Sequence, residues 1–472
     1  MKTNRKKTIF YLVDGARHDV MKSLLDAGEL PNIQQEILSR GTFRKATSCF
    51  PSTTGPAYLP PLLGCFPGTA NITGIRWFDK KEFRRKRFGK NAMRSYCGTE
   101  AAYFNSDMPV DRPTLHELLG ETYNIFSMIT RNIPESRDLA KKGKSLLYLK
   151  AHYLFQHHPV DVAAHGHLMR SLDENPDFVF TVLPCVDWNS HVYHPHHEET
   201  IKSYKFMDYS VGEVVKKLKA RGEWEDTLLL LTSDHGLTQT HTHFDLAAYF
   251  TRRGLRALQY PVVFKIRPKS AVMISGNSFG AVHLLNHEGD GILCGEAFKK
   301  AIGEDSLEDL IQQPAIDFVA WRGDEQDYFI GSKKGTARIL KKEKGLTYHP
   351  LTGDPFGLGV LDQPMDNQAA LAATFESDYP DGLVQIVQLF SSHRAGDLVV
   401  SAANGFDLRD NWEYPEHKGS HGSLHKDHIH VPLLYNQTGW DDRPARTTDI
   451  FNSILKWMGR PTLSNSDGAA LC

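Results

Sequence analysis

The sequence has no closely spaced pair of cysteines, no long apolar run and no excess of charge of one sign. Its six cysteines are scattered: Cys49, Cys65, Cys97, Cys185, Cys294 and Cys472. Without a CxxC pair, neither a disulfide framework nor a thiolate zinc site is indicated. No apolar run approaches the roughly 18 residues that a membrane span needs, and 55 basic residues balance 56 acidic ones. We therefore expect neither a transmembrane segment nor specific nucleic-acid binding.

The apolar run near the start of the chain also lacks the features of a signal peptide. Residues 8–13 follow several basic residues, but the run is short, ends at Asp14 and has no small-residue cleavage site. A buried strand is the better interpretation. We expect a cytoplasmic protein, and no pattern indicates its oligomeric state.

The first half of the chain alternates strand-like and helix-like segments. The runs Ile9–Val13, Phe178–Leu183 and Thr227–Leu231 are continuously apolar, as in parallel strands that are covered on both faces. Between them, Ala16–Ala27 and Ile201–Leu218 have the spacing of amphipathic helices. This alternation predicts a layered α/β/α fold with a mostly parallel central sheet.

The pattern changes near residue 260 and returns near residue 380. Tyr328–Leu340 and Thr347–Gly359 are rich in Gly, Lys and Thr, which favours a smaller β-rich insertion. We therefore divide the chain into a first part of an α/β catalytic core (1–265), an insertion or cap (about 266–375) and a closing part of the core (376–472).

Three aspartates follow three of the predicted strands. Asp14, Asp187 and Asp234 each come just after an apolar run. Because ligands of open α/β sheets bind beyond the carboxyl ends of the strands, we expect these carboxylates to meet at one edge of the sheet.

Histidines accompany these aspartates. His191 lies four residues after Asp187, on the same face of a helical turn, and His235 directly follows Asp234; Gly-Ser-His421-Gly adds a third imidazole. Carboxylates and neutral imidazoles are ligands for zinc or manganese. Two such ions about 4 Å apart would suit phosphoryl transfer, because they activate a nucleophile and stabilise the leaving oxygen.

A hydroxyl-rich turn supplies the nucleophile. In the segment Phe50–Pro56, either Thr53 or Thr54 can present an alkoxide to a metal ion. The residues that follow, Ala57–Leu63, have helical composition, and the free N–H groups at the start of a helix would bind a phosphoryl oxygen.

At this point the chain resembles the alkaline phosphatase superfamily, and most closely its nucleotide pyrophosphatase/phosphodiesterase branch. The resemblance covers about residues 7–265 and 380–460. It is strongest from Phe50–Pro56, through the small-residue segment that follows, to Thr73–Ile75. The match implies that Thr54, rather than Thr53, is the nucleophile and that turnover passes through a phospho-threonine.

The resemblance also implies the metal ligands. One ion would be held by Asp187, His191 and His421. The second would be held by Asp14, Thr54, Asp234 and His235. Zinc is the usual metal, with manganese as the alternative. For the last histidine, the His-Gly context favours His421 over His425 and His417.

The chain departs from the family pattern just after the nucleophile. Ala57-Tyr58 stands where many nucleotide-cleaving members have Asn-His, and no Asn is in register further on. Arg76 can replace that Asn as an oxyanion partner, because guanidinium clamps phosphate, or it can form a structural salt bridge. His241 and His243 are candidate substrate contacts at the rim of the site.

Two further segments allow a functional or a purely structural interpretation. The basic run Lys80–Arg87 would steer an anionic substrate, touch anionic lipid or form a solvated loop. Leu146–Phe155 would lie on a membrane surface or pack in the core.

The leading hypothesis is a metal-dependent phosphodiesterase or pyrophosphatase acting on a small phosphate ester or a lipid headgroup. The alternatives are a phosphomonoesterase or phosphonate hydrolase on the same metals, and an inactive binding protein that keeps the fold. A sulfatase is disfavoured because the nucleophile turn lacks the Cys or Ser followed by Pro and Arg.

Overall fold

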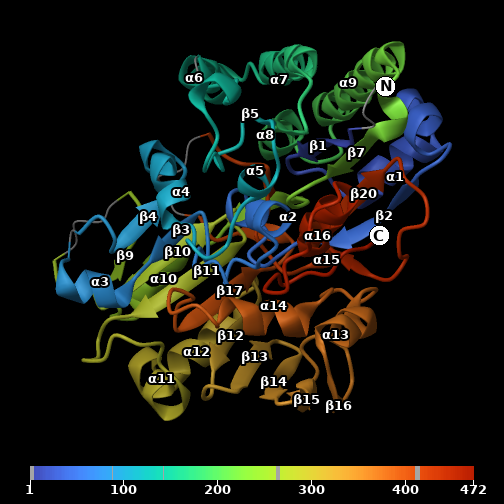
Figure 1. The fold of residues 1–472 in the computed structure, drawn as a ribbon. Coiled ribbons are helices and arrows are strands. Elements are labelled where there is room, and N and C mark those ends of the chain that lie inside the picture. Colours follow the sequence, from blue (N-terminus) through green and yellow to red (C-terminus); the bar gives the residue numbers. More distant parts are fainter. Residues whose placement is uncertain (1–4, 88, 142, 262–265, 410–414) are drawn as a thin grey trace.

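The computed structural model describes residues 5–87, 89–141, 143–261, 266–409 and 415–472 and contains two main sheets (Figure 1). The first sheet has the strand order β21-β2-β20-β7-β1-β6-β5. Its strands are β1 Lys7–Val13, β2 Thr42–Thr47, β5 Thr122–Ile125, β6 Phe178–Leu183, β7 Thr227–Thr232, β20 His430–Tyr435 and β21 Ala445–Arg446. β5, β6, β1 and β7 run parallel, whereas β20 is antiparallel to β7 and β2. The predicted mostly parallel α/β sheet is confirmed.

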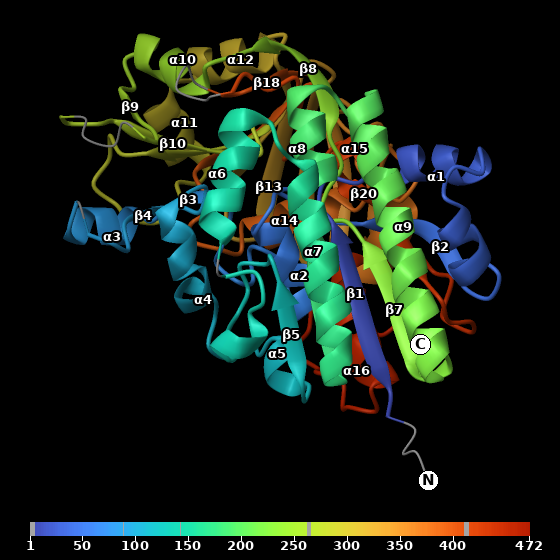
Figure 2. The same cartoon turned by 90° about the horizontal axis from the view of Figure 1, so that it is seen from above.

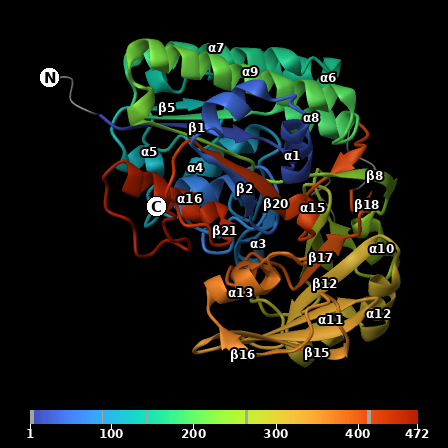
Figure 3. The ribbon, with the colours of Figure 1, turned by 90° about the vertical axis from the view of Figure 1, so that its right-hand side faces the viewer.

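Helices cover both faces of this sheet. α7 (His158–Ser171) and α9 (Glu198–Arg221) lie along one face, over β5, β1 and β7 (Figure 2). On the other face, α2 (Leu59–Leu63) packs against α16 (Thr447–Trp457), so the sheet lies between two helical layers (Figure 3).

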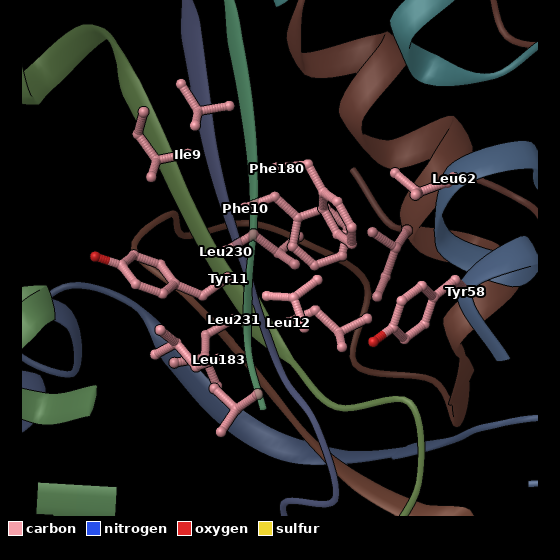
Figure 4. Close-up of a cluster of buried hydrophobic side chains, with 14 of the residues drawn as sticks. Ile9, Phe10, Tyr11, Leu12, Tyr58, Leu62, Phe180, Leu183, Leu230 and Leu231 are labelled. Carbon is pink, nitrogen blue, oxygen red and sulfur yellow. The ribbon is translucent and has the colours of Figure 1, made fainter. Parts of the chain in front are cut away.

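β1 is buried along its whole length because both of its faces are covered. Its side chains alternate between the two layers, as the pleat of a strand requires. Phe10 points toward Tyr58 and Leu62, whereas Tyr11 points the opposite way (Figure 4). The Tyr11 hydroxyl lies 3.1 Å from Oγ of Ser210 in α9. The continuous apolar runs of the sequence are therefore the two-sided contacts of a central strand.

The second sheet has nine strands in the order β16-β15-β14-β13-β12-β17-β11-β10-β9. Its strands are β9 Ala257–Leu258, β10 Ser270–Ser275, β11 Phe279–Leu284, β12 Ile316–Arg322, β13 Asp327–Ser332, β14 Gly335–Lys342, β15 Gly345–Gly353, β16 Leu361–Met365 and β17 Leu398–Ala402. All neighbours are antiparallel except β9 and β10. The sheet takes β9 and β17 from outside residues 266–375, and the division into catalytic core and insertion stays a prediction.

The second sheet also separates two apolar layers. Along β10, Val272 and Ile274 join the cluster that contains residues of α11 (Gly295–Ile302) and α12 (Glu304–Gln312). The alternate residues Ala271 and Met273 join the cluster formed with α14 (Gly382–Leu389). All of α14 is buried, and its two polar side chains, Gln385 and Gln388, are hydrogen-bonded inside the fold.

Shorter elements complete the fold. The helices are α1 His18–Asp26, α3 Lys80–Arg85, α4 Phe104–Asp107, α5 Leu115–Leu118, α6 Lys144–Leu154, α8 Cys185–Val192, α10 Leu246–Arg252, α13 Asn367–Thr374 and α15 Lys426–Ile429. The strands are β3 Arg76–Phe78, β4 Met93–Ser95, β8 Thr238–His243, β18 Gly405–Asp407 and β19 Gly419–Ser420. In the described part of the chain, no helix has both the length and the apolar character that crossing a membrane requires.

Candidate active site

Three aspartates meet at the carboxyl edge of the first sheet. Asp14 follows β1, Asp234 follows β7 after one serine, and Asp187 lies in the first turn of α8, which begins just after β6. Because β6, β1 and β7 are parallel neighbours, their carboxyl ends lie side by side. The sheet topology thus produces the convergence that the sequence predicts.

Gly15 allows the backbones after β1 and β6 to approach closely. Its φ is +73°, and a Cβ at this position would lie 2.8 Å from Cα of Asp187. The Gly15 N–H also donates a hydrogen bond of 3.2 Å to Oδ1 of Asp234. A side chain here would therefore both strain the turn and push the aspartates apart.

The structure brings the predicted metal ligands into two groups. The first group is Asp14, Asp234 and His235, and the second is Asp187, His191 and His421; the ligand atoms of each lie within 4.8 Å of one another. The rings of His235 and His421 stack, with centroids 3.7 Å apart and planes 8° apart. The two groups are therefore adjacent.

Backbone carbonyls orient all three imidazoles. Nδ1 of His191 lies 2.7 Å from the carbonyl oxygen of Gly419. Nδ1 of His421 lies 2.9 Å from that of Ser52, and Nδ1 of His235 lies 3.2 Å from that of Gly236. Because a carbonyl only accepts, each Nδ1 carries the proton and donates it. Each Nε2 keeps its lone pair, which is the tautomer that a metal ligand requires.

Thr54 lies against the first group. Its hydroxyl donates a hydrogen bond of 3.3 Å to Oδ1 of Asp14, and its Oγ1 lies 3.1 Å from Nε2 of His235. The hydroxyl of Thr53 is buried and has no hydrogen-bond partner among the described residues. Of the two threonines, Thr54 is the one that the fold places next to the carboxylates.

The carboxylates are buried near one another. Burial, followed by the charges of Asp234 and Asp187, raises the pKa of Asp14 well above its ordinary value. Burial, with a further contribution from Asp187, also raises the pKa of Asp234. For Asp187, burial opposes ionisation, but the neighbouring His191 outweighs it and lowers the pKa. Three carboxyl groups therefore share a site in which full ionisation is unfavourable.

A divalent cation would remove this conflict. Oδ1 of Asp187 and Oδ2 of Asp234 are buried without a hydrogen-bond partner among the described residues. Burial, together with His235 and His191, lowers the pKa of His421 well below its usual value, so its imidazole is neutral. Buried carboxylates normally pair with a cation or bind a metal. The donor set of carboxylates and neutral imidazoles fits zinc or manganese.

Tyr58 is a site residue to which the sequence assigned no role. Its hydroxyl donates a hydrogen bond of 2.9 Å to Oδ2 of Asp14. The side chain reaches Asp14 because the chain turns directly after Thr54 into the short helix Pro56–Tyr58. The Ala57-Tyr58 departure from the family pattern was the only signal, and it did not reveal this contact.

A cavity of about 520 Å³ opens over the second ligand group. Its lining includes Thr54, Asp187, His191 and His421. Its apolar and aromatic wall comes largely from α6 and α8: Tyr148, Leu149, Tyr153 and Trp188. A substrate bound at the ligand groups thus has an apolar surface beside it.

The hairpin between β10 and β11 supplies another wall of the cavity. Asn277 pairs with His421 in an isolated bridge, and its amide Nδ2 donates a hydrogen bond of 2.9 Å to Nδ1 of His417. The ring of His417 lies 4.4 Å from that of His191, whereas His425 caps α15. The ligand group contains His421 rather than either alternative. Nothing in the sequence around Asn277 indicated its place here.

Arg76 lies in the lining of the cavity, within reach of a substrate. His241 and His243, on β8, are not among the described lining residues. His241 is exposed, and His243 lies 2.9 Å from Asp407 and 3.2 Å from Glu416. The substrate-contact role of all three stays a prediction.

The basic run after Arg76 begins as helix α3, not as a solvated loop. Lys80 is 1% exposed, and its Nζ lies 2.7 Å from Oδ1 of the buried Asp397. Arg84 donates to the carbonyl of His287, and Arg85 pairs with Glu82. None of the described residues of the run lines the cavity. The start of the run therefore fastens α3 to the second sheet.

This fold and site define an alkaline phosphatase-like α/β protein with two adjacent ligand groups and a threonine beside them. A sequence model of the type I phosphodiesterase / nucleotide pyrophosphatase family matches residues 8–287. The chain belongs to this family of hydrolases, and the resemblance inferred from its motifs is confirmed.

Individual relatives are distant. Bis(5'-adenosyl)-triphosphatase ENPP4 of Pongo abelii is 37% identical over 70 residues, which are 14% of this chain and 16% of that protein. The Mus musculus enpp4 protein is 23% identical over 269 residues, or 54% of this chain and 53% of that protein. The matches thus span about half of these relatives or less. Among solved structures, murine ectonucleotide pyrophosphatase / phosphodiesterase 5 has 14% identity and a TM-score of 0.58, covering 98% of both chains. That likeness supports the fold alone.

Proposed function

We propose that this protein is a metal-dependent phosphodiesterase or pyrophosphatase in which Thr54 is the nucleophile. The observation that carries the proposal is the position of the Thr54 hydroxyl, 3.3 Å from Asp14 and 3.1 Å from His235. Family membership adds that such hydrolases cleave phosphodiester or pyrophosphate bonds. The ENPP4 relatives are named bis(5'-adenosyl)-triphosphatases, which places a pyrophosphate linkage among the substrates to test.

Asp14, Thr54, Asp234 and His235 would hold one divalent ion, and Asp187, His191 and His421 the other. When bound, such ions stabilise negative charge on the phosphoryl and leaving oxygens and favour the deprotonated hydroxyl. We propose zinc as the metal and manganese as its competitor, because both accept carboxylate and imidazole ligands.

Thr54 would attack phosphorus as its hydroxyl proton is lost. The new bond between Oγ1 and phosphorus forms while the bond to the leaving oxygen breaks, which leaves a phospho-threonine and releases the alcohol or phosphate leaving group. Water then attacks the same phosphorus, frees the phosphorylated product and restores the hydroxyl. Tyr58 holds Asp14 in place, and Arg76 would bind a non-bridging oxygen from the cavity wall.

The shape of the cavity favours a diester over a monoester. Its lining extends from the ligand groups to the apolar surface of Tyr148, Tyr153 and Trp188. A phosphomonoester presents only one substituent, whereas a diester has a second that this surface can bury. The phosphomonoesterase and phosphonate hydrolase alternatives use the same metals. They differ from the proposal only in the substituents that the substrate carries on phosphorus.

A direct test compares rates on bis-p-nitrophenyl phosphate, p-nitrophenyl phosphate and a phenyl phosphonate ester, each with zinc and with manganese. We expect the highest kcat/KM on the diester. A higher kcat/KM on the monoester or on the phosphonate would replace the proposal by the corresponding alternative. Absence of hydrolysis with either metal, in protein that binds metal, would favour an inactive binding protein.

A further inference from the structure

The helix that forms one wall of the cavity, α6, exposes apolar side chains on its outer face. Leu146, Leu149 and Leu154 are 59%, 55% and 60% exposed. Together with Tyr153 and Phe155 they form a patch, which we call the α6 face: Leu146, Leu149, Tyr153, Leu154 and Phe155. These five are among the twelve large exposed apolar side chains in the described part of the chain. Such clustering is typical of an interaction surface, whereas single exposed apolar residues are ordinary.

The sequence segment that carries the α6 face is basic. From residue 139 to residue 160 the sequence has four lysines and no aspartate or glutamate. Lys150 lies on the exposed side of α6 and has no acidic partner among the described residues. By contrast, the amine of Lys144 turns inward and donates to the carbonyl of Phe126. An exposed lysine among leucines and aromatic rings is complementary to a surface that is apolar below and anionic above.

The position and composition of the helix favour a bilayer over a protein partner. α6 lies at the outer edge of the molecule, beside α7 (Figures 1 and 2). Its exposed leucines lie on this one helix, and Phe155 follows directly after its last residue. Helices with leucine and aromatic side chains on one side and flanking lysines lie in the headgroup region of membranes. Lysine stems can extend along apolar surface and leave the amine at the lipid phosphates.

We propose that the α6 face docks onto an anionic lipid bilayer. Leu146, Leu154 and Phe155 enter the headgroup and acyl boundary, and Lys150 pairs with lipid phosphate. The same helix lines the active-site cavity through Tyr148 and His152, and Leu149 and Tyr153 of the α6 face belong to that lining as well. Docking therefore brings the mouth of the cavity to the membrane surface, and a phosphodiester in a lipid headgroup becomes a substrate. This last consequence rests on the proposed function, whereas docking itself does not.

Binding to vesicles tests the docking without any use of activity. The metal-loaded protein is sedimented with vesicles of phosphatidylcholine alone or of equal parts phosphatidylcholine and phosphatidylglycerol. We expect association with the anionic vesicles that weakens as salt is raised. Lys150→Gln should weaken it about fivefold, the contribution of one lysine near an anionic surface. Leu146→Gln with Leu154→Gln should weaken it by about tenfold or more.

The matched control is the pair Leu351→Gln and Val360→Gln, which removes two apolar side chains of similar exposure, 53% and 64%, from β15 and from the loop before β16. It should leave vesicle binding unchanged. The proposal is overturned if the wild-type protein stays in solution with anionic vesicles, or if both double variants bind equally. It is also overturned if light scattering shows that the wild type is a dimer and that the Leu146→Gln/Leu154→Gln variant alone is a monomer. The α6 face would then join two copies of the chain.

Activity separates docking from substrate choice. Hydrolysis of soluble bis-p-nitrophenyl phosphate should be the same in the Leu146/Leu154 double variant and in the wild type, since neither leucine lines the cavity. In the same double variant, hydrolysis of phosphatidylglycerol in vesicles should fall about tenfold or more, in parallel with the loss of vesicle binding. Vesicle binding with no headgroup hydrolysis would keep the docking surface and reject the lipid substrate. If the wild-type protein hydrolyses neither the lipid nor the soluble diester, the proposed function is overturned.

Discussion

Tyr58 and Asp14 are joined by a hydrogen bond of 2.9 Å, in which the phenol donates to Oδ2 of a carboxylate whose Oδ1 accepts from Thr54. The phenol ring is only 3% exposed, so the hydroxyl cannot exchange Asp14 for water. The two oxygens of one carboxylate are thus fixed by two residues that are four positions apart in the chain. Asp14 is held in a single orientation before any ligand arrives.

Removing this phenol should weaken metal binding and turnover without unfolding the protein. In Tyr58→Phe we expect a loss of about 10- to 100-fold in metal affinity or in kcat/KM, the usual effect of losing a partner that orients a metal ligand. The measurement is a zinc titration together with kcat/KM on a diester. The control is Tyr11→Phe, which removes the hydroxyl beside Ser210 in β1, the strand that precedes Asp14. It should affect stability alone. Equal zinc affinity in Tyr58→Phe and wild type would show that the hydrogen bond does not position Asp14.

Substitution of the nucleophile should separate chemistry from binding. Thr54→Ala should lower kcat by about 10³-fold or more, because the covalent step is lost, while thermal stability and metal content stay near wild type. Thr53→Ala removes a neighbouring hydroxyl that has no described partner and should retain turnover. Mass spectrometry after a rapid acid quench should find phosphate on Thr54 in the wild type. If Thr53→Ala is the inactive variant, the nucleophile has been misassigned.

Removing the metals should destabilise the fold. Asp14, Asp187 and Asp234 repel one another at their buried edge, and a bound cation cancels that repulsion. We expect metal analysis to find about two divalent ions per chain. A chelator should lower the melting temperature, because a ligand at about 100 times its Kd contributes ~2.7 kcal/mol to the free energy of unfolding. Asp187→Asn should reduce the metal content to about one ion per chain. An unchanged melting temperature in chelator, with activity retained, would exclude a metal site.

The buried ion pair of α3 gives a stability prediction far from the site. Lys80→Met would leave Asp397 charged and buried, accepting only from backbone N–H groups such as those of Leu284 and Leu293. We expect the free energy of unfolding to fall by about 3–5 kcal/mol. Lys81→Met, at the exposed neighbouring position, should change it by less than about 0.5 kcal/mol. Urea unfolding measures both. Similar values for the two variants would mean that the pair contributes little.

A buried histidine predicts a loss of stability in mild acid. Burial lowers the pKa of His116 from 6.5 to about 3, and both ring nitrogens lack a hydrogen-bond partner among the described residues. Below about pH 6.5 the unfolded chain binds a proton at His116, whereas the folded chain binds it only below about pH 3. The free energy of unfolding therefore has its full value above about pH 6.5 and decreases as the pH falls from 6.5 to 3. Between pH 7 and 5 the loss from this group is about 2 kcal/mol.

His116→Phe should remove that part of the pH dependence, because it leaves an aromatic ring against Phe178 and no titrating nitrogen. His241→Phe, at an exposed position, is the control and should keep the wild-type slope. The measurement is urea unfolding at several values of pH between 5 and 7. Parallel slopes for wild type and His116→Phe would show that His116 takes up its proton in the folded protein as it does in the unfolded chain.

The first ligand group was readable from the sequence because central parallel strands are unmistakable. Ile9–Val13 and Thr227–Leu231 are strongly apolar and buried at every position, since both of their faces are covered. The aspartate that ends each run must then lie at the carboxyl edge. That reasoning needs only local patterns and one rule of topology.

The remaining wall of the site depends on contacts that no local pattern specifies. Asn277 reaches His421 through a bridge between a hairpin of the second sheet and a loop far along the chain. Gly276 permits that approach, because a Cβ there would lie 2.5 Å from Nδ1 of His421. Similarly, periodicity could not tell whether Leu146–Phe155 faces core or solvent, since α6 both lines the cavity and exposes leucines to solvent.

The stacked rings of His235 and His421 join two distant parts of the chain. The other ligands have all been made by residue 235, but His421 comes late in a chain of 472 residues. During synthesis, a ribosome-bound chain would hold one complete ligand group while the other still lacks its histidine. Under the proposed two-metal function, such a chain would lack the site for the second ion until His421 is made, and β20 and β21 would still follow.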